Sequence, residues 1–138
     1  LKGIVSPGYH QYLDRILETC QAPYAVANGL ELTHASEECI RMRMVPRECD
    51  MNSMGRVHGA CLFGMVDHTF AIACNLKCDT TGQSVNILYH RPGGPGEIVS
   101  EARIINESRH LCICDVRLYQ NGKLIVSATC TGFKLCGV

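Results

Sequence analysis

One long apolar run constrains this chain most, and it lies in the stretch "NSMGRVHGACLFGMVDHTFAIACN" from Asn52 to Asn75. Its residues 59–74 are nearly all apolar, which predicts a helix roughly 24 Å long at about 1.5 Å per residue. A helix that is apolar on nearly every side is expected to be buried on most of them. Asp67 and His68 interrupt the run, so it is too short and too broken to span a bilayer. Four small residues allow a sheet to approach the helix closely: Ala60, Gly64, Ala71 and Ala73.

The rest of the chain predicts one more helix and a set of strands. Ser6 and Pro7 form a typical helix start, an apolar stripe follows, and Pro23 is expected to end the helix. Strands are expected at residues 27–33, 38–45, 84–90, 97–105, 110–120 and 123–134, several of which alternate apolar and polar residues. Asn121-Gly122 suits a type I′ hairpin turn. The order predicts an α+β fold in a single domain, residues 1–138: an antiparallel sheet of about six strands wrapped around one long central helix, with an N-terminal helix.

Charge excludes several classes of partner. Lys plus Arg and Asp plus Glu each number 13 among the 138 residues, and neither sign forms a block, so neither nucleic acid nor a membrane surface is an expected partner. The first ten residues, "LKGIVSPGYH", lack the apolar core of a secretory signal. These features predict a cytoplasmic protein.

Ten cysteines are many for this length. A metal site or a disulfide framework would be signalled by paired C-x-x-C spacings, and none occurs. Cys112 and Cys114 are expected on one face of a strand, where cysteine packs as a small apolar side chain. We therefore expect reduced, buried thiols and no metal.

Asp67 is the chemically unusual residue of the apolar run. A lone buried carboxylate is costly, and acids in such surroundings cluster at functional sites. The start of the same helix offers unpaired N–H groups, and Gly59 would let a ligand oxygen approach the backbone. Together they resemble half of an acyl-transfer site, with donors for an oxyanion and an acid or base at some distance. A second interpretation makes Asp67 an exposed helix residue or the partner of Arg91.

The other polar residues of this region also have simpler interpretations. His58, directly before the helix, fits a capping or loop-fixing residue. His68 lies about 100° around the helix from Asp67, so the two need not face one pocket. Asn52 by itself is an ordinary loop residue.

The spacing of Asn52, Gly55, His58, Gly59 and Asp67 resembles the signature of the PaaI-like hotdog-fold acyl-CoA thioesterases. Two further stretches, "NILYHRPGGPGE" and "NGKLIVSATCTGFKL", are similar to a strand and loop and to the closing hairpin of that family. The resemblance covers roughly residues 25–135, and its order of elements agrees with the one expected above.

This resemblance implies roles for individual residues. Asp67 would be the nucleophile or the general base for water, and the Gly59 N–H would bind the thioester carbonyl oxygen. Asn52 would orient the thioester or the water, and His58 would fix the loop and contribute to the polar catalytic site. The implied reaction hydrolyses a small to medium or aromatic acyl-CoA to free acid and CoA without a cofactor. The site would lie at the interface of a homodimer or a dimer of dimers.

The sequence departs from the family pattern at two positions. Ala60 replaces the second glycine of the motif. Many members support the acid with Ser or Thr on the next strand; here Ser84 is the first candidate and Thr81 another, whereas an ungapped register falls on Gly82.

Further residues are expected to bind substrate. Tyr89 matches the wall of the acyl or pantetheine tunnel, and the CoA phosphates have three candidate partners: Arg56, Arg91 and Arg109. Two other functions remain open. One is an acyl-CoA-binding hotdog protein without turnover, and the other is a related hydratase, which the Asp-centred motif fits poorly.

Overall fold

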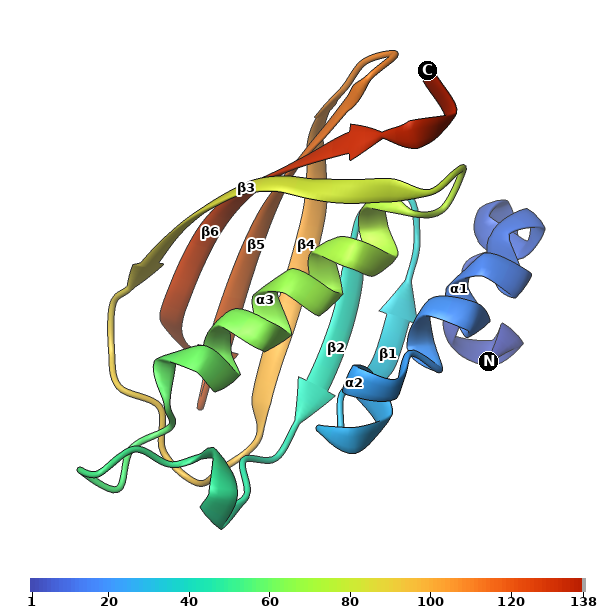
Figure 1. The fold of residues 1–138 in the computed structure, drawn as a ribbon. Helices are drawn as coiled ribbons and strands as arrows, with labels where there is room; N and C mark the ends of the chain where they lie inside the picture. Colours follow the sequence, from blue (N-terminus) through green and yellow to red (C-terminus); the bar gives the residue numbers. More distant parts are fainter. Residues whose placement is uncertain (138) are drawn as a thin grey trace.

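The computed structural model describes residues 1–137 and is built from one antiparallel sheet around one long helix (Figure 1). The sheet has six strands in the order β1-β2-β4-β5-β6-β3. Their bounds are β1 Glu31–Ala35, β2 Ile40–Met44, β3 Thr80–Tyr89, β4 Ile98–Glu107, β5 Leu111–Gln120 and β6 Lys123–Lys134. The central helix α3 spans Gly59–Cys74 and lies against the concave face of the sheet. The predicted α+β architecture is therefore confirmed.

Shorter helices cover α3 on the side of β1. The chain begins with the 3-10 turn η1 Lys2–Ile4, continues through η2 Pro7–Tyr12 and α1 Leu13–Cys20, and then forms α2 Pro23–Ala27. Two further 3-10 turns are η3 Glu48–Asp50 and η4 Leu135–Gly137. Figure 1 shows α1 and α2 beside α3, on the same side of the sheet. Within residues 1–137 no helix is both long and apolar enough to cross a membrane.

The core is formed by the inward-facing apolar residues of the strands and by the apolar faces of the helices. In β5 the fully buried residues are Cys112, Cys114, Val116 and Leu118, which face the core at every second position. The Sγ atoms of Cys112 and Cys114 are 4.0 Å apart, so the prediction that they share a face is confirmed. One polar pair crosses this core, because the Thr69 and Ser100 hydroxyls lie 2.6 Å apart.

The predicted boundaries fail mainly before residue 40. A strand over 27–33 is wrong in its first half, because Pro23 does not end a helix but occupies the first turn of α2. Gly29, at φ 66°, turns the chain out of that helix, and β1 begins only at Glu31. The first helix also differs from the prediction, since residues 7–12 form a 3-10 turn before α1 begins.

The expectation that all ten thiols are reduced is also corrected. Cys78 and Cys136 form a disulfide across a sequence separation of 58 residues. It joins the segment before β3 to the turn after β6, two neighbouring strands whose ends the fold brings together. The other eight cysteines are free. Spacing along the chain gave no sign of this pair, because only the tertiary contact brings the two residues together.

Candidate functional site

The start of α3 presents an unpaired backbone amide. His58 is the N-cap, and its Nδ1 accepts a hydrogen bond from the Ala60 N–H at 2.9 Å. Its own N–H donates to the Asp50 carbonyl at 2.8 Å, which anchors the loop. The simpler interpretation of His58 as a capping and loop-fixing residue is thus what the structure shows. No acceptor within residues 1–137 takes the Gly59 N–H, so this donor is available at the positive end of the helix dipole.

Asn52 shapes the loop in front of that amide. Its Oδ1 accepts from the N–H groups of Met54, at 2.9 Å, and Arg56, at 3.1 Å. The Asn52 N–H also donates to the Arg56 carbonyl at 2.7 Å, and Gly55 makes the turn possible with φ 72°. Because the oxygen of the Asn52 amide is occupied, its Nδ2 is the end that can donate to a ligand.

Tyr89, at the end of β3, forms the opposite wall. Its hydroxyl donates to the Gly59 carbonyl at 3.3 Å. A Cβ atom at position 59 would lie 3.7 Å from the Tyr89 ring, which is ordinary van der Waals contact. The packing of this single chain therefore leaves room for a small side chain at Gly59.

Asn52, Gly59 and Tyr89 line one cavity of about 290 Å³, whereas His58 does not. The sequence-predicted residues that meet in it are Asn52, Arg56, Gly59, Tyr89 and Arg91. The Arg91 guanidinium donates to the Leu124 carbonyl at 3.0 Å, so Arg91 is not the partner of Asp67.

Asp67 lies outside this cavity and is exposed, which corrects the expectation of a hidden acid. It is eight residues after Gly59, roughly 12 Å along the helix axis. The exposed residues Ala60, Phe63 and Asp67 follow one stripe along α3. Within residues 1–137 no side chain or backbone group forms a hydrogen bond or ion pair with the Asp67 carboxylate. One chain therefore presents the acid and the amide separately.

The strand residue beside Asp67 is Gly82. A Cβ atom at Gly82 would lie 4.0 Å from Asp67 Oδ1, on the inner face of β3. The register shifts after Gly82, and Ser84 pairs with Thr131, on the outer face of the sheet. Thr81, which pairs with Phe133, lies on the outer face as well. Neither Ser84 nor Thr81 contacts Asp67 in its own chain, and the residue of β3 beside Asp67 is Gly82.

One predicted substrate-binding residue, Arg109, lies elsewhere. Arg109 occupies the turn between β4 and β5, next to Leu111, which pairs with Phe133. That is the Thr80 end of β3, and the structure does not bring Arg109 into the cavity with Tyr89. His68 is buried, with 7% of its surface exposed, whereas the adjacent Asp67 is exposed. Burial lowers the pKa of His68, against the opposing influence of the Asp67 charge and the Thr19 backbone.

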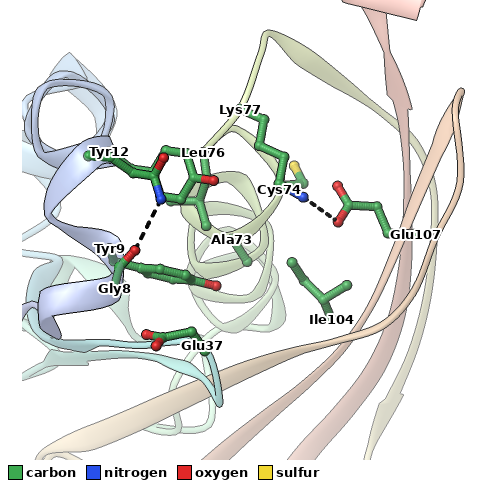
Figure 2. Close-up of a pocket in the computed structure, with 11 residues that line it drawn as sticks. Gly8, Tyr9, Tyr12, Glu37, Ala73, Cys74, Leu76, Lys77, Ile104 and Glu107 are labelled. Atoms are coloured by element: carbon green, nitrogen blue, oxygen red, sulfur yellow. Dashed lines mark hydrogen bonds and ion pairs between the residues drawn. The ribbon is translucent and has the colours of Figure 1, made fainter.

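A second cavity, of about 260 Å³, lies at the other end of α3 (Figure 2). Its wall includes Tyr9, Tyr12, Glu37 and the ion pair between Lys77 Nζ and Glu107, at 3.2 Å. It contains none of the residues that the sequence motif singles out.

Comparison with known proteins shows the family and the fold to which this chain is similar. The family model described as "Thioesterase superfamily" matches residues 54–126, more than half of the chain. A Deinococcus radiodurans protein named "Putative esterase" is 27% identical over 74 residues, which are 54% of this chain and 51% of that protein. The chain thus matches about half the length of this curated relative.

Solved structures extend the likeness to the whole fold. A mutant of the phenylacetic acid degradation protein PaaI from Thermus thermophilus has a TM-score of 0.79 and 29% identity, covering 83% of this chain and all of that one (100%). The E. coli PaaI protein from the phenylacetic acid degradation operon has a TM-score of 0.84 at 21% identity, covering 92% and 93% of the two chains. The architecture is the PaaI-like hotdog fold, and the chain belongs to the thioesterase superfamily.

Proposed function

We propose that this protein is an acyl-CoA thioesterase that hydrolyses small to medium or aromatic acyl-CoA substrates to the free acid and CoA. The observation that carries the proposal is the pair of unpartnered groups on α3: the Gly59 N–H beside the cavity and the exposed Asp67 carboxylate. Family membership supports thioester hydrolysis in general. The acyl-CoA substrate and the residue roles are parts of the proposal.

The site is completed by a second chain. Tyr89, beside Gly59, ends β3, whereas Gly82, beside Asp67, lies near its start. β3 is also an edge of the sheet, with most of its residues exposed. Antiparallel pairing of two β3 strands about a two-fold axis would bring the start of each against the end of the other. Asp67 of one chain would then face Gly59 and Asn52 of its partner.

The chemistry follows from these groups. The thioester oxygen accepts the Gly59 N–H as negative charge develops on it, and the α3 dipole favours that charge. Asp67 either attacks the carbonyl carbon or takes a proton from the attacking water. The C–S bond then breaks, and the leaving thiolate needs little protonation because a thiol has a pKa near ~8.5. In the nucleophilic route the acyl group remains on Asp67 as a mixed anhydride, which water then hydrolyses to the free acid and the regenerated carboxylate. Asn52 Nδ2 donates to the thioester or the water, while His58 holds the helix start in place.

The cavity wall suggests how CoA is held. Arg56 and Arg91 lie at the cavity with Tyr89, on the side where the CoA chain would leave. Their guanidinium groups suit phosphate oxygens. Arg109 and Ser84, on other parts of the chain, would reach substrate only in a larger assembly.

The test is release of free thiol from a panel of short, medium and aromatic acyl-CoAs. We expect turnover by the natural protein and a loss of about 100-fold or more in kcat for Asp67→Asn and Asp67→Ala. Tyr119→Phe, in β5, is the control for handling and folding. Turnover that survives both Asp67 substitutions contradicts the mechanism. Tight binding of acyl-CoA without turnover supports the non-catalytic alternative, and loss of enoyl-CoA absorbance supports a hydratase.

A further inference from the structure

Among residues 1–137, the Asp67 carboxylate has no hydrogen-bond donor beside it. On the strand side it lies beside Gly82, where a Cβ atom would be 4.0 Å from Asp67 Oδ1 but which has no side chain to donate a hydrogen bond. Across residues 1–137 no other donor contacts it either. In the proposed function, Asp67 attacks the thioester carbonyl carbon or activates a water molecule. A hydrogen bond to the carboxylate would fix its orientation for either step, because a freely rotating carboxylate is mostly in unreactive orientations.

Among the described residues, the Tyr24 hydroxyl beside α3 is equally without a partner. Tyr24 belongs to α2, which is held in place by Ala25, a residue with no exposed surface. The phenol of Tyr24 is half exposed and lies across Gly64. A Cβ atom at Gly64 would come within 3.0 Å of Cζ and closer still to the hydroxyl oxygen. In the described part of the chain, no protein group forms a hydrogen bond with the Tyr24 hydroxyl.

The two groups are neighbours on one helix face. Gly64 and Asp67 are three residues apart, so their side-chain positions lie roughly 5–6 Å from each other. The Tyr24 hydroxyl occupies the place of the missing Gly64 side chain. It is therefore within reach of the Asp67 carboxylate, directly after a small rotation or through one water.

We propose that Tyr24 is a positioning residue of the thioesterase site, and that its hydroxyl donates the hydrogen bond which orients Asp67 in place of the absent strand hydroxyl at Gly82. This inference rests on the proposed function of Asp67. The phenol donates to one carboxylate oxygen and leaves the other free for water or the carbonyl carbon.

The protonation state of the phenol suits this role. Burial raises the pKa of Tyr24, and the Cys61, Asp50 and Asp67 side chains raise it further, while Arg47 opposes them. The hydroxyl therefore keeps its proton at neutral pH and is available as a donor.

Tyr24→Phe removes the hydroxyl and leaves the ring. We expect kcat for acyl-CoA hydrolysis to fall about tenfold, the effect of one hydrogen bond to a charged group, with KM unchanged within about twofold. Tyr12→Phe, at the second cavity of Figure 2, is the matched control and should not change kcat.

Gly82→Ser supplies the rescue. A Cβ atom at Gly82 meets Phe70 at 3.8 Å and Asp67 Oδ1 at 4.0 Å, both ordinary contacts, so serine fits and its hydroxyl reaches the carboxylate. In the Tyr24→Phe background, Gly82→Ser should restore kcat to within about twofold, whereas Gly82→Ala should restore nothing. A loss that serine does not repair, or that alanine repairs equally, overturns the proposal.

Gly64→Ala tests the same contact without touching Tyr24. The new methyl group would displace the phenol, while alanine is more favourable than glycine within a helix. We expect the same loss as for Tyr24→Phe, and no additional loss when the two changes are combined. Additive losses overturn the proposal. If the natural protein releases no thiol from any acyl-CoA, the proposed function fails. If Asp67→Asn keeps full turnover, the proposed role of Asp67 fails. If Asp67→Asn is inactive and Tyr24→Phe is fully active, only the role of Tyr24 fails.

Discussion

Asp67 and His68 are adjacent in sequence, yet α3 turns their side chains to opposite surroundings. Asp67 is exposed, whereas His68 is buried. The Nε2 atom of His68 has no hydrogen-bond partner among the described residues. Successive residues of a helix differ by about 100° in direction, which is enough to separate them. The sequence indicated that the two need not share a pocket. It could not say which of them was inside.

The buried imidazole of His68 makes stability depend on pH. Its folded-state pKa is lowered, mainly by burial, while in the unfolded chain it is about 6.5. The unfolded state therefore binds the proton more readily, and the free energy of unfolding should fall as pH drops below about 6.5 towards the folded-state pKa. We expect this contribution, at most about 1.4 kcal/mol per pH unit, to disappear in His68→Gln.

Urea unfolding at a series of pH values between about 8 and 5 measures the effect. His110→Gln, which changes an exposed histidine between β4 and β5, is the matched control. The same slope in His68→Gln and the natural protein would show that His68 is not responsible.

At the scale of elements, α3, β6 and the hairpin before β6 were predicted within a residue, since each is encoded by its own local pattern. The turn adopts positive φ at Asn121 (52°) and Gly122 (74°), as the dipeptide indicates. The start of β3 was less predictable. The register shift between Gly82 and Ser84 decides which side chain faces Asp67, and a shift of one residue exchanges the two faces of a strand.

The crossing of β3, β6 and α3 leaves no space at Gly132. A Cβ atom there would meet Thr80 Cγ2 at 2.6 Å and Phe70 Cζ at 3.1 Å. We expect Gly132→Ala to lower the free energy of unfolding by about 1–3 kcal/mol, because Thr80 and Phe70 must both shift. Chemical denaturation measures the loss. Gly3→Ala, which meets no atom within 4 Å, is the control and should be nearly neutral.

For the whole molecule, the Cys78–Cys136 disulfide closes a long loop. Denatured but unreduced protein should show eight reactive thiols, and ten after reduction. Because the bond restricts the unfolded chain across a separation of 58 residues, reduction should lower the free energy of unfolding by about 2–4 kcal/mol. The double variant Cys78→Ser/Cys136→Ser should not respond to a reductant. Ten thiols without reduction would contradict the pairing.

Assembly of the proposed site from two chains also makes a prediction. Asp67→Asn and Asn52→Ala should each be nearly inactive alone. Unfolding and refolding them together forms mixed dimers, each with one intact and one doubly altered site, so roughly a quarter of the natural activity should return. If Asp67 and Asn52 acted within one chain, mixing would restore nothing. Co-refolding each variant with itself is the control.

Local sequence patterns were sufficient to predict α3, the closing hairpin and the wrapped sheet. The spacing of the motif residues was sufficient to indicate the thioesterase family. Periodicity and turn residues are written in consecutive positions, so these features can be read along the chain. Four others became known from the folded chain alone: Asp67 is exposed, Gly82 lies beside it, Tyr24 covers Gly64 and Cys78 meets Cys136. Each of these depends on segments far apart in sequence and on the register at which they meet, which no local pattern encodes.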